Sequence, residues 1–140
     1  MAGAEMRELD HRTLVATRQL VAGDVTALAA RGVTLIVNNR PDREEPGQPD
    51  GAEIEAAARA AGLAYRQIPV SGGFNLDDVL AMAEALEAAE GKALLCCRTG
   101  TRSTFLWALA RSERGASSAE LAAAAAGAGY DLSPIAAYLG

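Results

Sequence analysis

The sequence predicts an α/β fold in which a parallel sheet of about four strands is flanked by helices. Short runs rich in β-branched residues alternate along the chain with longer runs that carry helix signals. This order is typical of parallel sheets covered on both faces. Half of the 140 residues are hydrophobic, which is enough for a substantial core. We therefore expect residues 1–140 to form one domain.

Four segments have the character of strands. The clearest is Val33–Asn39, VTLIVNN, because β-branched and other apolar residues dominate it. The others are shorter: Thr13–Thr17, Tyr65–Val70 and Ala93–Cys96. Ligands of parallel sheets bind at the carboxyl ends of the strands. The loops that leave the last three strands of the chain are therefore expected to surround one cleft.

The segments between and after the strands carry helix signals. Alanine has the highest helix propensity, so the Ala-rich stretch Ala119–Gly129 is predicted as helix. Asn75 is a favoured N-cap residue, and the acidic residues that follow it suit the first turn of a helix. The predicted helices cover about residues 24–30, 51–61, 76–90, 102 onward, 118–128 and 133–139.

Composition and charge exclude several classes of function. The net charge of −5 argues against a nucleic-acid partner, which would need a basic face. No apolar run reaches the length of a membrane span, and the polar start of the chain lacks a secretory segment. We expect a cytoplasmic protein without a membrane partner. No His, Cys or Asp cluster has metal-ligand spacing, so neither a metal nor another cofactor is expected.

The two cysteines lie side by side in the stretch LLCCRTGTRS. Counted from Cys96, Arg102 completes the C-x5-R spacing of cysteine phosphatases. Counted from Cys97, it completes C-x4-R, the spacing of many single-domain rhodaneses. Adjacent Cα atoms lie about 3.8 Å apart, below the usual lower limit of about 4.4 Å for a disulfide, so free thiols are expected. Cys97 is the expected nucleophile because Gly100 follows three places later and because Cys96 suits the end of a buried strand.

A short loop between a strand and a helix N-terminus can bind an anion, since its N–H groups converge and the helix dipole favours negative charge. The same field favours the thiolate form of a cysteine. We therefore predict Cys97 and Arg102 as catalytic residues, with the planar guanidinium of Arg102 holding two oxygens of an oxyanion. The predicted substrate-binding residues are Arg98, Thr99, Gly100, Thr101 and Ser103 in the loop, and Asn39 and Arg40 at the end of the neighbouring strand.

Several stretches resemble the phosphatase-like domain of beta-lactamase-hydrolase-like (Blh) proteins. They are VNNRPDREEPGQP (Val37–Pro49), AEIEAAARAAGLAY (Ala52–Tyr65), IPVSGG (Ile68–Gly73), CRTGTRS (Cys97–Ser103) and GYDLS (Gly129–Ser133). The resemblance implies a fold similar to that of dual-specificity cysteine phosphatases, with Cys97 as nucleophile and Arg102 as anion clamp. In this family the domain also occurs fused to persulfide dioxygenases and sulfide-oxidising flavoproteins, which implies a role in sulfur metabolism.

The sequence leaves three functions open. We expect a rhodanese-type sulfurtransferase, in which Cys97 takes sulfur from thiosulfate or a persulfide and passes it to a thiol acceptor. This follows from the C-x4-R spacing and from the lack of an acid in the VSGGFN loop, since phosphomonoester hydrolysis uses a general acid. Asp42, Glu44 and Glu45 are substitutes in principle. The alternatives are a cysteine phosphatase that binds a phosphorylated anion, and a non-enzymatic module that binds anions or carries persulfide.

Overall fold

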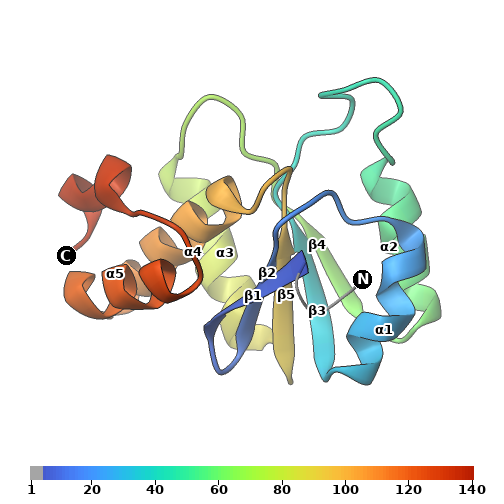
Figure 1. Cartoon of the computed structure of the whole chain (residues 1–140), viewed down its shortest axis with the longest axis horizontal. Coiled ribbons are helices and arrows are strands. Elements are labelled where there is room, and N and C mark those ends of the chain that lie inside the picture. Colours follow the sequence, from blue (N-terminus) through green and yellow to red (C-terminus); the bar gives the residue numbers. More distant parts are fainter. Residues whose placement is uncertain (1–4) are drawn as a thin grey trace.

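The computed structural model describes residues 5–140 and contains a five-stranded sheet between two layers of helices (Figure 1). The strands are β1 (Met6–Asp10), β2 (Thr13–Ala16), β3 (Val33–Asn38), β4 (Ala64–Gln67) and β5 (Lys92–Cys96). Their order across the sheet is β1-β2-β5-β3-β4, and every neighbouring pair is parallel except β1 and β2. This arrangement confirms the predicted α/β fold.

The helices form a layer on each side of the sheet (Figure 1). On one side are α1 (Val25–Ala30) and α2 (Gly51–Ala60), and on the other are α3 (Leu76–Ala88), α4 (Thr101–Glu113) and α5 (Ser118–Gly127). The segments η2 (Ala22–Asp24) and η3 (Ser133–Tyr138) are 3₁₀ helices. The last predicted helix is therefore a 3₁₀ segment. Within residues 5–140, no helix is both long enough and apolar enough to cross a membrane.

The strand that sequence analysis missed is β1. It pairs antiparallel with β2 at one edge of the sheet, with Met6 opposite Ala16. Only Met6 and Leu9 of its five residues are buried, and it lacks the β-branched run that marks β3. The sheet therefore has five strands rather than about four, and the additional strand adds an antiparallel edge to an otherwise parallel sheet.

Successive residues of β5 point into two different cores. Leu94 and Cys96 belong to the core on the side of α1 and α2, whereas Leu95 belongs to the core formed with α3 and α4. This is the alternation expected of a strand, whose successive side chains leave opposite faces. The Cys96 side chain is therefore packed in the core beside α1 and α2. Cys97, the next residue, is the first residue of the loop that follows β5.

The central position of β5 determines where that loop lies. β5 pairs with β2 on one side and with β3 on the other, so its carboxyl end lies inside the sheet rather than at an edge. The Asn39 N–H donates to the Cys96 carbonyl over 2.7 Å, and the Ile68 N–H donates to the Asn38 carbonyl over 2.9 Å. These bonds bring the loops after β3, β4 and β5 to the same end of the sheet.

Candidate active site

The cysteine loop, residues 97–102, joins the carboxyl end of β5 to the first turn of α4. Gly100 is the N-cap residue of α4 and has a φ of +93°, a left-handed conformation that favours glycine. Its N–H donates to Sγ of Cys97 over 3.1 Å. The loop therefore turns back on the sulfur atom beside the positive end of the α4 dipole, where negative charge on sulfur or on a bound oxyanion is stabilised.

Cys96 and Cys97 are both 1% exposed but have different environments. Cys96 packs in the same core as Ile36 and Leu94, and burial raises the pKa of its thiol, with a further increase from charge on Cys97. Cys97 instead receives the Gly100 N–H and lies within reach of the Arg102 guanidinium. These contacts favour Cys97 over Cys96 for nucleophilic chemistry, and its role as the nucleophile stays a prediction.

Arg102 connects the three loops at the carboxyl ends of the strands. Its Nη1 donates to Oε2 of Glu44 over 2.7 Å and to the Val70 carbonyl over 3.0 Å, and its Nη2 donates to Oε1 of Glu44 over 2.9 Å. Glu44 follows β3 and Val70 follows β4, so the three loops meet at one end of the sheet as predicted, and the cleft that they were expected to surround stays a prediction. The hydrogen bond to Glu44 raises the pKa of Arg102, and charge on Cys97 raises it further.

The acidic loop, residues 41–50, supplies carboxylates to three arginines of the site. Oε1 of Glu44 accepts from Nε of Arg40 over 2.8 Å, and Oε1 of Glu45 lies 2.5 Å from Nη2 of Arg40 and 3.2 Å from Nε of Arg98. Arg102 completes the group. Three guanidinium groups and two carboxylates leave a net charge of +1. Hydrogen bonds from Arg102 and Arg40 lower the pKa of Glu44 to about 2, so Glu44 is ionised at neutral pH.

Asn39, Arg40 and Ser103 lie buried behind the cysteine loop. The Ser103 hydroxyl donates to Oδ1 of Asn39 over 2.8 Å, and Nδ2 of Asn39 donates to the Ile68 carbonyl over 2.9 Å. Arg40 is 3% exposed beneath the acidic loop. These contacts hold the first turn of α4 against the ends of β3 and β4, which is a positioning role. Direct contact of the three residues with substrate stays a prediction.

The exposed rim of the cysteine loop is formed by Arg98, Thr99 and Thr101. The Arg98 side chain is 64% exposed, and the hydroxyl oxygens of Thr99 and Thr101 lie 3.2 Å apart. Tyr130, which follows α5, donates its hydroxyl to the Thr99 carbonyl over 2.8 Å and lies against Gly100. Sequence analysis did not assign Tyr130 to the site, although the GYDLS stretch contains it. Its position depends on the path of the chain after α5, which no local pattern specifies.

Asp42, Glu44 and Glu45, the candidate replacements for the missing general acid, have different contacts. Asp42 accepts a hydrogen bond from the Gly51 N–H over 2.8 Å at the start of α2, which is a structural contact. Glu44 is the partner of Arg102 and is ionised, so it has no proton to donate at neutral pH. Glu45 pairs with Arg40 and Arg98. Among residues 5–140, no group of three or more His, Cys, Asp or Glu residues is placed to hold a metal ion.

Comparison with known proteins identifies the family. The family model of the beta-lactamase hydrolase-like protein, phosphatase-like domain, matches residues 5–114. The chain belongs to this family. A beta-lactamase hydrolase-like protein of Xylella fastidiosa is 46% identical over 82 residues, which are 58% of this chain and 19% of that protein. The chain thus matches about a fifth of the length of this relative, and the resemblance of the sequence to Blh proteins is confirmed.

Solved structures extend the comparison to phosphatases. A candidate phosphatase of Neisseria meningitidis is 33% identical, with a TM-score of 0.80 over 94% of this chain and 93% of that one. TpbA of P. aeruginosa, solved in complex with pTyr, is 20% identical, with a TM-score of 0.66 over 96% of this chain and 82% of TpbA. At that identity the likeness to TpbA shows the fold alone. The predicted cysteine-phosphatase-like fold is confirmed.

These comparisons contradict the predicted sulfurtransferase function. The family is that of a phosphatase-like domain, and the Neisseria protein, at 33% identity, is a candidate phosphatase, so the rhodanese-type prediction is wrong and the phosphatase alternative fits better. The physical reason lies in the loop. In this C-x4-R loop a buried thiol, a backbone N–H and an arginine side chain lie together, and such a group can bind an oxyanion. The loop length by itself therefore does not select sulfur transfer over phosphoryl transfer.

Proposed function

We propose that this domain is a cysteine phosphatase that hydrolyses phosphate monoesters through a phosphocysteine at Cys97. The observation that carries the proposal is the position of the Cys97 sulfur at the N-terminal end of α4, with the Gly100 N–H at 3.1 Å and Arg102 within reach. Membership of a phosphatase-like family and the likeness to the Neisseria protein support it.

The reaction proceeds in two displacements at phosphorus. The Cys97 thiolate attacks phosphorus and forms the S–P bond, while the bond from phosphorus to the ester oxygen breaks. Water then attacks phosphorus and loses a proton, the S–P bond breaks, and the thiolate and inorganic phosphate are released. Loop N–H groups and Arg102 stabilise the charge on the non-bridging oxygens in both steps.

The contacts of Arg102 leave some N–H groups of its guanidinium free to bind substrate. Glu44 and Val70 together accept from three of its N–H groups. A guanidinium has five, so two remain for the Cys97 sulfur and for phosphoryl oxygens. Glu44 in this account is a positioning residue, because it binds the Arg102 guanidinium rather than the substrate. The net charge of +1 on the surrounding arginines and carboxylates favours a dianionic substrate.

The substrates that this site suits best are aryl phosphates such as phosphotyrosine. Glu44 is ionised and Asp42 is held by the Gly51 N–H, so neither suits the protonation of a leaving oxygen. A phenolate leaves without a proton far more readily than an alkoxide, since the pKa of a phenol is only about 10. Binding of pTyr by TpbA, which shares the fold, agrees with this choice.

Steady-state turnover tests the proposal. The wild type should release inorganic phosphate from p-nitrophenyl phosphate, and an alkyl phosphate should react much more slowly. Cys97→Ser should lower kcat by at least about 1,000-fold because the nucleophile is lost. Cys96→Ala is the matched control and should retain activity. Saturable binding of phosphate without turnover would instead support the non-enzymatic anion-binding module.

A further inference from the structure

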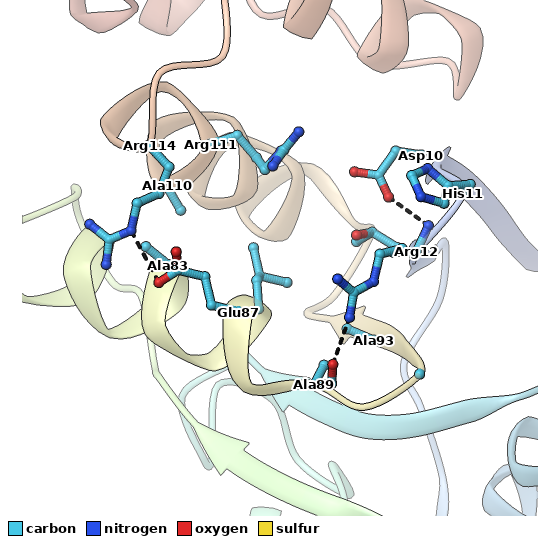
Figure 2. A pocket seen from close by; sticks show the side chains of 13 residues that line it. Asp10, His11, Arg12, Ala83, Glu87, Ala89, Ala93, Ala110, Arg111 and Arg114 are labelled. Atoms are coloured by element: carbon cyan, nitrogen blue, oxygen red, sulfur yellow. Dashed lines mark hydrogen bonds and ion pairs between the residues drawn. The ribbon is translucent and has the colours of Figure 1, made fainter.

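A second cluster of arginines lines the pocket shown in Figure 2. Gly91 and Ala93 at the start of β5 also line it, whereas the cysteine loop follows the end of β5, so the pocket lies at the opposite end of the sheet. The turn between β1 and β2 contributes Arg12 and His11, the last turns of α3 contribute Glu87, and the end of α4 contributes Arg111 and Arg114. The proposed active site begins at the other end of α4. Because a helix rises about 1.5 Å per residue, nine residues from Arg102 to Arg111 correspond to about 13.5 Å along its axis.

Two of the three arginines have partners within the pocket. Nη2 of Arg12 donates to the Ala89 carbonyl over 2.6 Å, at the end of α3. Nε of Arg114 lies 3.2 Å from Oε1 of Glu87, in a pair whose side chains are 40% and 60% exposed. Figure 2 shows both contacts as dashed lines at the pocket wall. The pair of Arg114 and Glu87 is solvated and therefore weak.

Arg111 differs from these two. Its Nε atom is buried and has no hydrogen-bond partner among the residues that the structure describes. A cation in the last turn of α4 suits the helix dipole, which explains the position of Arg111 but not its buried, unpaired N–H. Buried N–H groups in proteins almost always have an acceptor. The Arg111 side chain as a whole is half-buried, but its Nε–H lacks the acceptor that its position requires.

The pocket is cationic and small. Arg12, Arg111 and Arg114 carry three positive charges, and Asp10 and Glu87 carry two negative ones, which leaves +1 with His11 neutral. Oδ1 of Asp10 accepts the backbone N–H of Arg12 over 2.8 Å. The cavity volume is about 140 Å³, below the range of about 300–1,000 Å³ that is usual for drug-sized ligands. These properties select a small anion rather than an organic cofactor.

We propose that this pocket binds a small tetrahedral oxyanion, with Arg111 as the principal donor. Its guanidinium offers parallel N–H groups that match two oxygens of one phosphate or sulfate ion. Arg12 and Arg114 line the same pocket from opposite sides and add positive charge around the ion (Figure 2). The site is separate from the cysteine loop, so it goes beyond the proposed phosphatase reaction and does not depend on it.

Side-chain NMR tests the proposal residue by residue. The Nε–H signals of the arginines are followed while inorganic phosphate is added to about 50 mM at constant ionic strength, which is well above a Kd of about 1 mM. The Arg111 signal should shift and saturate, together with those of Arg12 and Arg114. Binding at the cysteine loop is reported separately by Arg102. Sulfate should act like phosphate, and sodium acetate should bind more weakly.

Two variants complete the experiment. Arg111→Gln should abolish the response of Arg12 and Arg114. Arg59→Gln is the matched control, because Arg59 is an exposed arginine on α2 that pairs with Glu55. It should leave the response unchanged. The proposal is overturned if the Arg111 signal does not shift, if chloride shifts it as much as phosphate, or if acetate binds more tightly than phosphate. Unchanged responses of Arg12 and Arg114 in Arg111→Gln would also overturn it.

Discussion

Glu44 links the acidic loop to the cysteine loop, and its removal should lower stability in a pH-dependent way. Its pKa is lowered from 4.5 to about 2, chiefly by the hydrogen bond from Arg102 and further by Arg40. At about 1.4 kcal/mol for each pKa unit, this difference corresponds to about 3.5 kcal/mol. The side chain is 28% exposed, and solvent screening reduces the expected contribution to about 1–2 kcal/mol. Glu44→Gln removes the charge and keeps the shape.

The pH dependence has a definite sign. A carboxylate with a lowered pKa stabilises the fold fully above its unfolded value near 4.5, and this stabilisation is lost as the pH falls towards 2. Urea unfolding should therefore give Glu44→Gln a deficit of about 1–2 kcal/mol near pH 7 and less than about half of it near pH 3. Glu55→Gln, from the exposed pair with Arg59, should lose at most about 0.5 kcal/mol. Equal stability of wild type and Glu44→Gln near pH 7, or an undiminished deficit near pH 3, would refute this reasoning.

Three further predictions concern the cysteine loop. Arg102→Lys keeps the charge but loses the planar fork, so kcat/KM for an aryl phosphate should fall by about 100-fold or more, whereas Arg98→Ala, at an exposed side chain, should cost about tenfold at most. Equal losses would mean that charge alone governs the site. Cys96→Ala should lower the free energy of unfolding by about 1–2 kcal/mol with activity retained, and a folded but inactive variant would contradict the assignment of Cys97. Gly100→Ala places a Cβ atom against the Tyr130 hydroxyl at a φ of +93° and should cost about 1–3 kcal/mol in thermal unfolding; an unchanged melting temperature would contradict this loop conformation.

The sequence predicts those elements of the fold that have a clear local pattern of residues. The β-branched run of β3 and the N-cap Asn75, whose side chain accepts from the Asp78 N–H, follow from the sequence directly. β1 was not predictable in this way, because a strand at the edge of a sheet buries few side chains and only Met6 and Leu9 are buried. Its pairing with β2 depends on the hairpin that joins the two strands rather than on its own residues.

The active site likewise has features that the local sequence predicts and features that depend on contacts between distant residues. Cys97, Gly100 and Arg102 lie within six residues, and the turn from strand to helix positions them together, so their spacing alone identifies the loop. The bidentate pair of Arg102 with Glu44 joins residues 58 apart and depends on how the acidic loop folds over the site. The prediction of sulfur transfer was wrong because it relied on loop length and on a missing acid. Neither feature determines which electrophile the thiolate attacks.

The most direct test of the account is to identify the residue that carries the phosphoryl group during turnover. Wild-type protein is mixed with an aryl phosphate, quenched in acid within one turnover and fragmented for mass spectrometry. The account predicts one phosphoryl group on Cys97, the same adduct in Cys96→Ala and none in Cys97→Ser. A phosphoryl group on Cys96, or turnover that proceeds without any adduct on Cys97, would contradict it.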